Sequence, residues 1–199
     1  MRLWWLLLAG AGLVVLALSI LKAREPSIGP AERRVFHAIN GWPGWLYPIL
    51  WPPMQLGNLV VGTVAGLVVA TVHRDLGVAV GVGVAVTMKL VTERVVRKEM
   101  AGALAIRQRP GTSQVGAVLR GGDVPMAGPS FPSGHVILVA SVACVVAGTI
   151  PVAWWWVLVL LTAAVMVGRV YVGAHNPLDV IAGLGAGLLS GGIVAAIFN

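Results

Sequence analysis

Two short polar motifs flank a long apolar stretch in the C-terminal half of the chain. The first, Pro132–His135, reads Pro-Ser-Gly-His, and the second has Arg169, His175 and Asp179 in the spacing Arg-x5-His-x3-Asp. A histidine followed four residues later by an aspartate is typical of a nucleophile or base whose tautomer a carboxylate fixes. The preceding arginine adds a planar cation that suits phosphate oxygens.

The stretch between the motifs is long enough to bring them together. His135 and Arg169 are separated by 33 residues, almost all apolar, and two antiparallel membrane helices need about 17–25 residues each. Such a hairpin returns the chain to the face that it left, so Arg169 and His175 are expected beside Ser133 and His135. Arginines in the segment 107–110 lie on the same side. We therefore predict a phosphate-binding cluster at a membrane surface.

The first motif is also expected to begin a helix. Ser133 can cap that helix, Gly134 allows a ligand close to the backbone, and the free N–H groups attract an anion. A plain capped helix with an interfacial histidine is the alternative interpretation of this motif alone. The second motif favours the catalytic interpretation, because two histidines across one hairpin are hard to explain structurally.

The composition indicates an integral membrane protein. The 199 residues are 58% hydrophobic and 11% charged, and the mean hydropathy is +0.90. Lipid requires that every backbone polar group be paired, and continuous apolar runs without alternation favour helices over a barrel. The single cysteine, Cys144, excludes an internal disulfide. The net charge is +7, and the cationic residues lie in membrane-flanking loops. This placement favours anionic lipid headgroups as partners and argues against nucleic acid.

We predict an all-α protein of about six transmembrane helices in one bundle, with an active site at the interface, forming a single domain over 1–199. The motif-bearing part is 94–199 and an interfacial connector covers 22–56. The connector holds a short amphipathic segment, 32–39, and an aromatic belt over 42–53 that we do not count as a span. The expected spans are 3–21, 57–72, 76–96, 134–150, 152–168 and 177–197.

Two features of these spans have alternative interpretations. The first span is interpreted as a retained helix rather than a signal peptide, because no small-residue cleavage site precedes Lys22. Lys89 lies inside the third span and is interpreted as a snorkelling or internally paired lysine rather than a substrate ligand. Glycines at four-residue spacing allow close helix packing, and glycine-rich helices also allow a homo-oligomer.

Taken together, the motifs resemble the type-2 phosphatidic acid phosphatase superfamily of membrane lipid phosphatases. Its signature is Lys-x6-Arg-Pro, Pro-Ser-Gly-His and Ser-Arg-x5-His-x3-Asp. The second element is complete here, but the leading serine of the third is Gly168. The first retains Arg109-Pro110, whereas its lysine position is Gly102. Lys98, about one helical turn earlier, or Arg107 are the candidates to replace that lysine.

The resemblance implies a hydrolase of lipid phosphates that needs no metal or other cofactor. His175 would form a phosphohistidine, Asp179 would hold its ring, and His135 would act as acid and then base. The phosphate oxygens would be bound by the following groups: Arg109, Arg169, the Ser133 hydroxyl and the Gly134 N–H, with Lys98 or Arg107 as a further cation. Clustered arginines would repel a divalent metal.

Phosphatidate, phosphatidylglycerol phosphate and polyprenyl phosphates or diphosphates are all open as substrates, because no motif reads the lipid tail. The alternative function is a non-catalytic carrier that binds lipid phosphate or phosphate in the same pocket. Eleven of the Lys and Arg residues fall on the motif-bearing face against two on the other. The positive-inside rule then places the site on the cytoplasmic side of the membrane with both termini outside, whereas the resemblance favours the outer face.

Overall fold

The computed structural model describes residues 2–25, 27–103 and 107–198, without the side chains of 97 and 99–103. These residues form helices and connecting loops. The helices are α1 (Arg2–Ala23), α2 (Pro30–Asn40), α3 (Tyr47–Gln55), α4 (Leu59–His73), α5 (Leu76–Ala103), α6 (Pro110–Ser113), α7 (Gly134–Ala147), α8 (Trp155–Tyr171) and α9 (Pro177–Phe198), with short 3₁₀ turns η1 (Gly44–Leu46) and η2 (Val152–Trp154) before α3 and α8.

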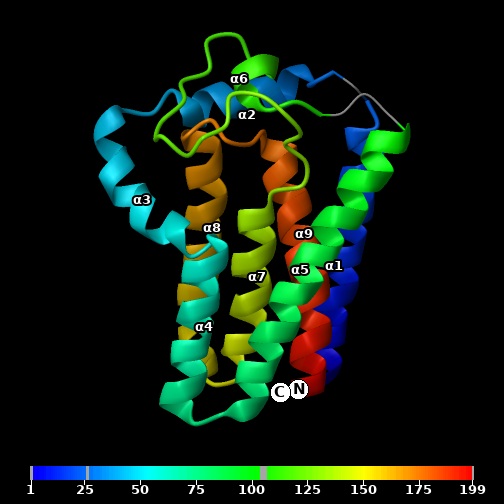
Figure 1. Cartoon of the computed structure of the whole chain (residues 1–199), viewed down its shortest axis with the longest axis vertical. Coiled ribbons are helices and arrows are strands. Elements are labelled where there is room, and N and C mark those ends of the chain that lie inside the picture. The colour runs from blue at the N-terminus through cyan, green and yellow to red at the C-terminus, as the bar shows by residue number, and fades with distance from the viewer. Residues whose placement is uncertain (1, 26, 104–106, 199) are drawn as a thin grey trace.

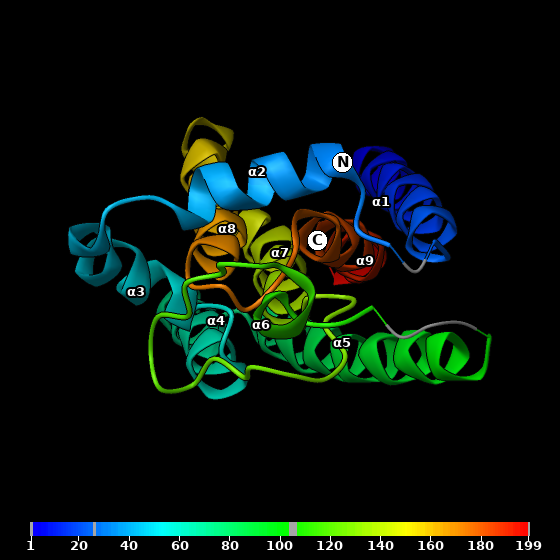
Figure 2. The same ribbon diagram turned by 90° about the horizontal axis from the view of Figure 1, so that it is seen from above.

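The long helices form one bundle around α7. Seen from above, α7 lies among α4, α5, α8 and α9, and α1 packs along the outer side of α9 (Figure 2). The short helices α2 and α6 and the long loop before α7 gather at one end of the bundle, while α1 begins and α9 ends at the opposite end (Figure 1). The predicted hairpin of α7 and α8 is therefore confirmed, and its open end faces the loops.

Glycine allows the two central helices to approach closely. A Cβ on Gly187 of α9 would lie 2.6 Å from the Cβ of Ala140, and a Cβ on Gly191 would lie 2.7 Å from the Cα of Ser141 on α7. The Ser141 hydroxyl meets that of Ser190 at 2.8 Å across the same contact. Small residues and interhelical hydrogen bonds are the usual means of helix packing in lipid, so this glycine stripe serves contacts within the chain.

Polar side chains fix the loop segments on the end of the bundle. Asn40, at the end of α2, donates to the carbonyl oxygens of Val118 and Tyr171, both at 2.9 Å, and accepts from the Val118 N–H at 2.8 Å. Arg120 donates to the same Tyr171 carbonyl at 2.7 Å. Two of these bonds satisfy the carbonyl of Tyr171, the last residue of α8, which has no partner within the helix. They also place the loop before α7 over the end of α8, close to Arg169.

The structure corrects two of the predicted boundaries. The aromatic belt over 42–53 is largely helical: η1 and α3 join α4 at a 60° bend and can count with it as one broken span. Pro48 fits the first turn of α3 because the N–H groups there need no partner. The helix of the third span, expected to end at residue 96, continues as α5 to Ala103 through good helix formers.

Four helical segments are long and apolar enough to cross a membrane, or five if the bent pair is counted as one span: 2–23, 76–96, 152–171 and 177–198, with 44–73 as the bent pair. Helix α7 has 14 residues, which at 1.5 Å each is about 21 Å, shorter than a typical hydrocarbon core of about 30 Å. The chain is thus an all-helical, multi-pass membrane protein.

Candidate active site

His175 lies in the loop between α8 and α9 and is almost fully buried. Its Nδ1 is 3.8 Å from Oδ2 of Asp179 in the first turn of α9. This distance is longer than a hydrogen bond. The structure thus brings the carboxylate beside the imidazole, and Asp179 faces Nδ1 and leaves Nε2 for other partners.

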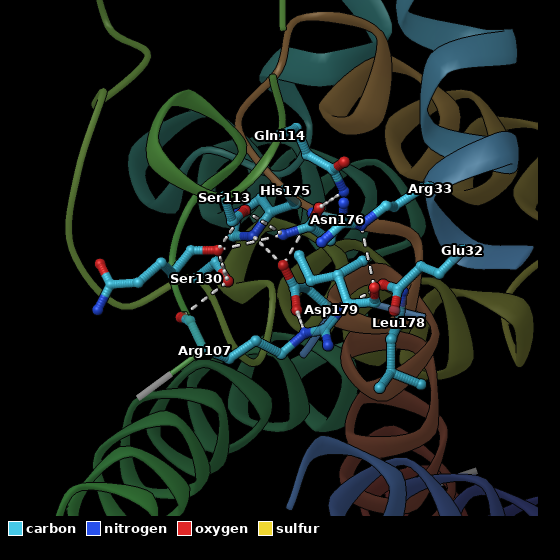
Figure 3. A network of polar contacts seen from close by, with 12 residues as sticks. Glu32, Arg33, Arg107, Ser113, Gln114, Ser130, His175, Asn176, Leu178 and Asp179 are labelled. Carbon is cyan, nitrogen blue, oxygen red and sulfur yellow. Dashed lines mark hydrogen bonds and ion pairs between the residues drawn. The ribbon is translucent and has the colours of Figure 1, made fainter. Parts of the chain in front are cut away.

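The Asp179 carboxylate is fixed from its other sides. Oδ2 accepts the backbone N–H of Asn176 at 2.8 Å, and Oδ1 accepts Nε of Arg107 at 2.7 Å (Figure 3). Asp179 is completely buried, so both bonds are made away from water. A carboxylate with two fixed donors keeps its orientation toward the third group, the imidazole.

Burial sets the protonation of His175. Loss of hydration lowers the pKa of this imidazole below its ordinary value, Asp179 opposes that shift, and the charges of Arg169 and Arg109 add to it. Desolvation is the largest of these effects because it penalises the charged form. His175 is therefore neutral at neutral pH, which is the form that can attack phosphorus.

The motif at the start of α7 reaches the same place. The N–H of Ser133 donates to the carbonyl oxygen of Asp179 at 3.0 Å, which joins the first turn of α9 to the residue before α7. His135 lies within electrostatic range of His175, Arg169 and Arg109. The two motifs, which are about 40 residues apart in the sequence, are thus neighbours at the end of the bundle where the loops lie.

Ser133 does not have the capping role expected of it. Its side chain makes no capping hydrogen bond with α7, and its backbone carbonyl accepts from the N–H of Ile137 at 3.1 Å. The residue is completely buried, and its Oγ has no partner among the described residues. A buried hydroxyl without a partner costs free energy, and it is available to bind a ligand oxygen.

Two arginines complete the site. Arg169, in the last turn of α8, is buried, and its Nη1 is 4.0 Å from the exposed carboxylate of Asp123. Arg109 donates from Nη1 to the carbonyl oxygen of Ala174 at 2.9 Å, directly before His175. Both guanidinium groups therefore lie beside the histidine.

Two unpaired buried donors, on Ser133 and Arg169, indicate where a ligand would bind. Five buried side-chain polar atoms lack a hydrogen-bond partner in the described part of the chain, and three of them belong to the two motifs: Ser133 Oγ, Arg169 Nε and His175 Nδ1. Buried polar groups are normally paired. Nδ1 of His175 faces Asp179, whereas Ser133 Oγ and Arg169 Nε are donors that an anion could bind.

The candidates for the missing lysine differ in position. Lys98 is exposed on α5. Arg107 is buried, and its guanidinium joins Asp179 to Glu32 of α2 (Figure 3). Sequence reasoning did not assign a role to Glu32, because its only signal was its place in an amphipathic segment. Lys89, which lies inside the third expected span and is not one of these candidates, pairs with Glu93 at 2.7 Å. This contact confirms its interpretation as an internally paired lysine.

The Lys89–Glu93 pair also contacts the first motif. A Cβ added to Gly134 would lie 2.7 Å from a carboxylate oxygen of Glu93, and Lys89 lies within electrostatic range of His135. Gly134 thus permits a close approach to the backbone, and the group that approaches it here is a carboxylate from α5 rather than the ligand that we expected. An ion pair inside a membrane span is costly, which suggests that this one serves the site.

The presence of glycine at position 168, where the family signature has serine, has a steric explanation. A Cβ on Gly168 would lie 2.5 Å from Cγ and 2.6 Å from Sδ of Met54. Met54 is buried between α3 and α8. A serine at position 168 would therefore clash with this methionine, and the hydroxyl of the family signature is replaced by a packing contact.

Comparison with known proteins agrees with these motifs. The sequence profile of the PAP2 superfamily matches residues 102–199, which contain Arg109 and both later motifs. The chain belongs to the PAP2 superfamily. The profile is that of the superfamily whose signature these motifs resemble.

Individual PAP2 relatives are similar over different lengths. A match to an undecaprenyl-diphosphatase of Sulfolobus acidocaldarius is 49% identical over 55 residues, which is 27% of this chain and 26% of that protein. The match therefore spans about a quarter of the curated relative. The phosphatase identity of that relative applies to this chain only as a proposal.

Two solved PAP2 structures have the same fold. The crystal structure of Aquifex aeolicus LpxE superposes with a TM-score of 0.66 at 21% identity, covering 81% of this chain and 92% of that one. The first transmembrane PAP2 type phosphatidylglycerolphosphate phosphatase from Bacillus subtilis gives 0.65 at 22% identity, covering 91% and 92%. At this identity the likeness concerns the fold.

Proposed function

We propose that this protein hydrolyses the phosphate ester or diphosphate of a membrane lipid through a phosphohistidine. The observation that supports this most is that His175, with Nδ1 facing Asp179, lies within electrostatic range of Arg169, while Ser133 Oγ and Arg169 Nε are buried without a partner among the described residues. These groups supply a nucleophile, its orienting carboxylate and donors for a phosphate. A neutral, buried imidazole suits nucleophilic attack better than a role as a simple cation.

The first step transfers the phosphoryl group to His175. Nε2 attacks phosphorus with its lone pair while Nδ1–H faces Asp179, and the bond from phosphorus to the lipid oxygen breaks. His135 protonates the departing oxygen, so the lipid leaves as an alcohol, or as a monophosphate if a diphosphate was bound. In the second step His135 takes a proton from water, which attacks the phosphohistidine and releases phosphate.

The remaining residues bind the phosphoryl oxygens. Arg109, Arg169, the Ser133 hydroxyl and the Gly134 N–H stabilise the charge that these oxygens carry in the transition state. The Arg109 bond to Ala174 and the buried position of Arg169 limit the movement of both guanidinium groups. Positive charge supplied by arginines takes the place that a metal ion has in other phosphatases, so we propose a metal-independent reaction.

The site is proposed to lie at the membrane interface of a six-span protein, with α7 as a short sixth span and η1–α3–α4 as a bent one. A lipid phosphate can then enter the site while its tail stays in the bilayer. The undecaprenyl-diphosphatase match favours a polyprenyl diphosphate, and the fold is shared with a phosphatidylglycerolphosphate phosphatase. Both substrate classes should be tested together with phosphatidate.

Phosphate release by the purified protein tests the proposal. In detergent with EDTA, the protein should release phosphate from at least one of these lipids, and His175→Ala should abolish the release. Acid-labile, base-stable labelling of the wild-type protein by a ³²P-lipid would identify the phosphohistidine. Binding of a lipid phosphate without turnover would instead support the carrier, and dependence on added magnesium would contradict the mechanism.

A further inference from the structure

A second carboxylate is connected to the catalytic pair through Arg107. The guanidinium of Arg107 donates from Nε to Asp179 and from Nη2 to Oε1 of Glu32. The Arg107 and Asp179 side chains are 3% and 0% exposed, and that of Glu32 is 16% exposed. The order Glu32, Arg107, Asp179, His175 is thus a continuous polar chain away from bulk water (Figure 3).

Glu32 also holds the backbone next to Asp179. Its Oε1 accepts the N–H of Leu178 at 2.9 Å, in the first turn of α9. That N–H has no partner within the helix, so Glu32 acts as a cap supplied by α2. One carboxylate therefore contacts both the side chain that holds Asp179 and the turn that carries it.

The charge of Glu32 matters for His175. Arg107 alone would neutralise much of the negative charge of Asp179, because the two groups are in contact at 2.7 Å in a buried site. Glu32 shares the positive charge of Arg107, which leaves more of the Asp179 charge facing the imidazole. Burial raises the pKa of the Glu32 carboxyl, and the contact with Arg107 opposes this.

We propose that Glu32 is a positioning residue for the reaction, acting through Arg107 to orient Asp179 and preserve its negative charge toward His175. The inference rests on the proposed function, since it assigns a role to Glu32 in the same site. It places part of the catalytic apparatus on α2, a helix outside the matched residues 102–199.

The decisive variant is Glu32→Gln, which removes the charge but keeps an oxygen that can accept from Leu178 and Arg107. We expect kcat to fall about 10- to 100-fold with KM within about twofold, because orientation of the nucleophile is affected and lipid binding is not. Glu32→Asp keeps the charge and should restore part of the rate. Glu25→Gln is the matched control, because Glu25 is exposed and pairs only with Lys22 among described residues.

A double-mutant cycle separates positioning from general structure. If Glu32 acts through Asp179, Glu32→Gln should cost less than about twofold in kcat in an Asp179→Asn background. Equal losses in both backgrounds would overturn the proposal. So would a kcat of Glu32→Gln equal to that of wild type.

Histidine NMR gives a result that does not depend on turnover. The groups that face His175 are Asp179 on α9, Arg169 on α8, Arg109 directly before α6 and His135 on α7. Glu32→Gln should lower the pKa of His175, assigned by comparison with His175→Ala, because it leaves Arg107 to neutralise Asp179. An unchanged pKa contradicts the inference even if the enzyme is active, whereas a shifted pKa in a protein that releases no phosphate contradicts only the proposed function.

Discussion

The amide nitrogen of Ser133 donates a hydrogen bond of 3.0 Å to the carbonyl oxygen of Asp179. This bond joins the residue before α7 to the first turn of α9, and so couples the unpaired Ser133 hydroxyl to the carboxylate beside His175. A backbone hydrogen bond therefore helps to fix the relative position of the two motifs, and this bond does not depend on the motif side chains. Variants at the motif side chains should therefore report on chemistry more than on folding.

Removal of either histidine should lower turnover strongly, and removal of His175 should abolish it. We expect His175→Ala to leave no measurable phosphate release, and His135→Ala to lower kcat by about 10²- to 10⁴-fold, since general acid catalysis contributes that much. His37→Ala is the control, because His37 is exposed on α2. Size-exclusion elution and thermal melting in detergent should match the wild type. Wild-type rates in both site variants would contradict the role assignments.

The pH dependence should reflect the burial of His175. Its pKa is lowered by desolvation, so the imidazole stays neutral at pH values below its ordinary pKa of about 6.5, and the acid limb of kcat/KM should lie below that value. Asp179 raises this pKa, so Asp179→Asn should move the acid limb further down while reducing the rate. An acid limb above pH 6.5 would show that His175 is not the neutral nucleophile.

The same group affects stability. His175 binds fewer protons in the folded state than in the unfolded state, so its contribution to stability is fully present above about pH 6.5 and is lost as the pH falls toward its folded-state pKa. His175→Ala should therefore weaken the fall in melting temperature between pH 7 and pH 5. Parallel melting curves of wild type and variant across this range would contradict the prediction.

The cations near the site should differ in importance. Lys98→Ala should change kcat/KM by less than about threefold, because an exposed cation interacts weakly. Arg107→Ala should be far more harmful, because it leaves the carboxylates of Asp179 and Glu32 buried without their partner. A large effect of Lys98→Ala would instead assign Lys98 the position of the missing lysine.

Lys89→Met tests the ion pair beside Gly134, and we expect a loss of activity with the protein still folded.

Gly168 should not accept the serine of the family signature. Gly168→Ser is expected to destabilise the protein by about 1–3 kcal/mol, because its Cβ overlaps Met54. The double variant Gly168→Ser/Met54→Ala should recover part of that loss, which thermal melting in detergent can measure. Gly168→Ser with a wild-type melting temperature would show that Met54 moves aside at little cost.

The helices were predictable because hydrophobic length is a local property. The expected spans 3–21, 76–96 and 177–197 correspond closely to α1, the apolar part of α5, and α9. Two segments differ from the prediction. The proline-containing segment 47–55 is helical, and α7 ends at Ala147 rather than near residue 150.

The motif residues themselves were also predictable. Their types and spacing identified His135, His175 and Asp179 as one site, because a helical hairpin of known length has only one way to return to the same face. The amphipathic pattern of 32–39 likewise predicted α2. It could not indicate that one face of α2 supplies Glu32 to the site.

The sequence by itself thus determined that this is a multi-pass membrane protein, and that two imidazoles, a carboxylate and several arginines lie near one surface. Only the tertiary structure decided that Arg107 binds Asp179 and Glu32, that Glu93 approaches Gly134, and that Met54 fills the space at Gly168. Each of these contacts joins residues at least 40 positions apart. Side-chain contacts between helices depend on how the helices rotate and pack, which hydrophobic pattern and motif spacing do not specify.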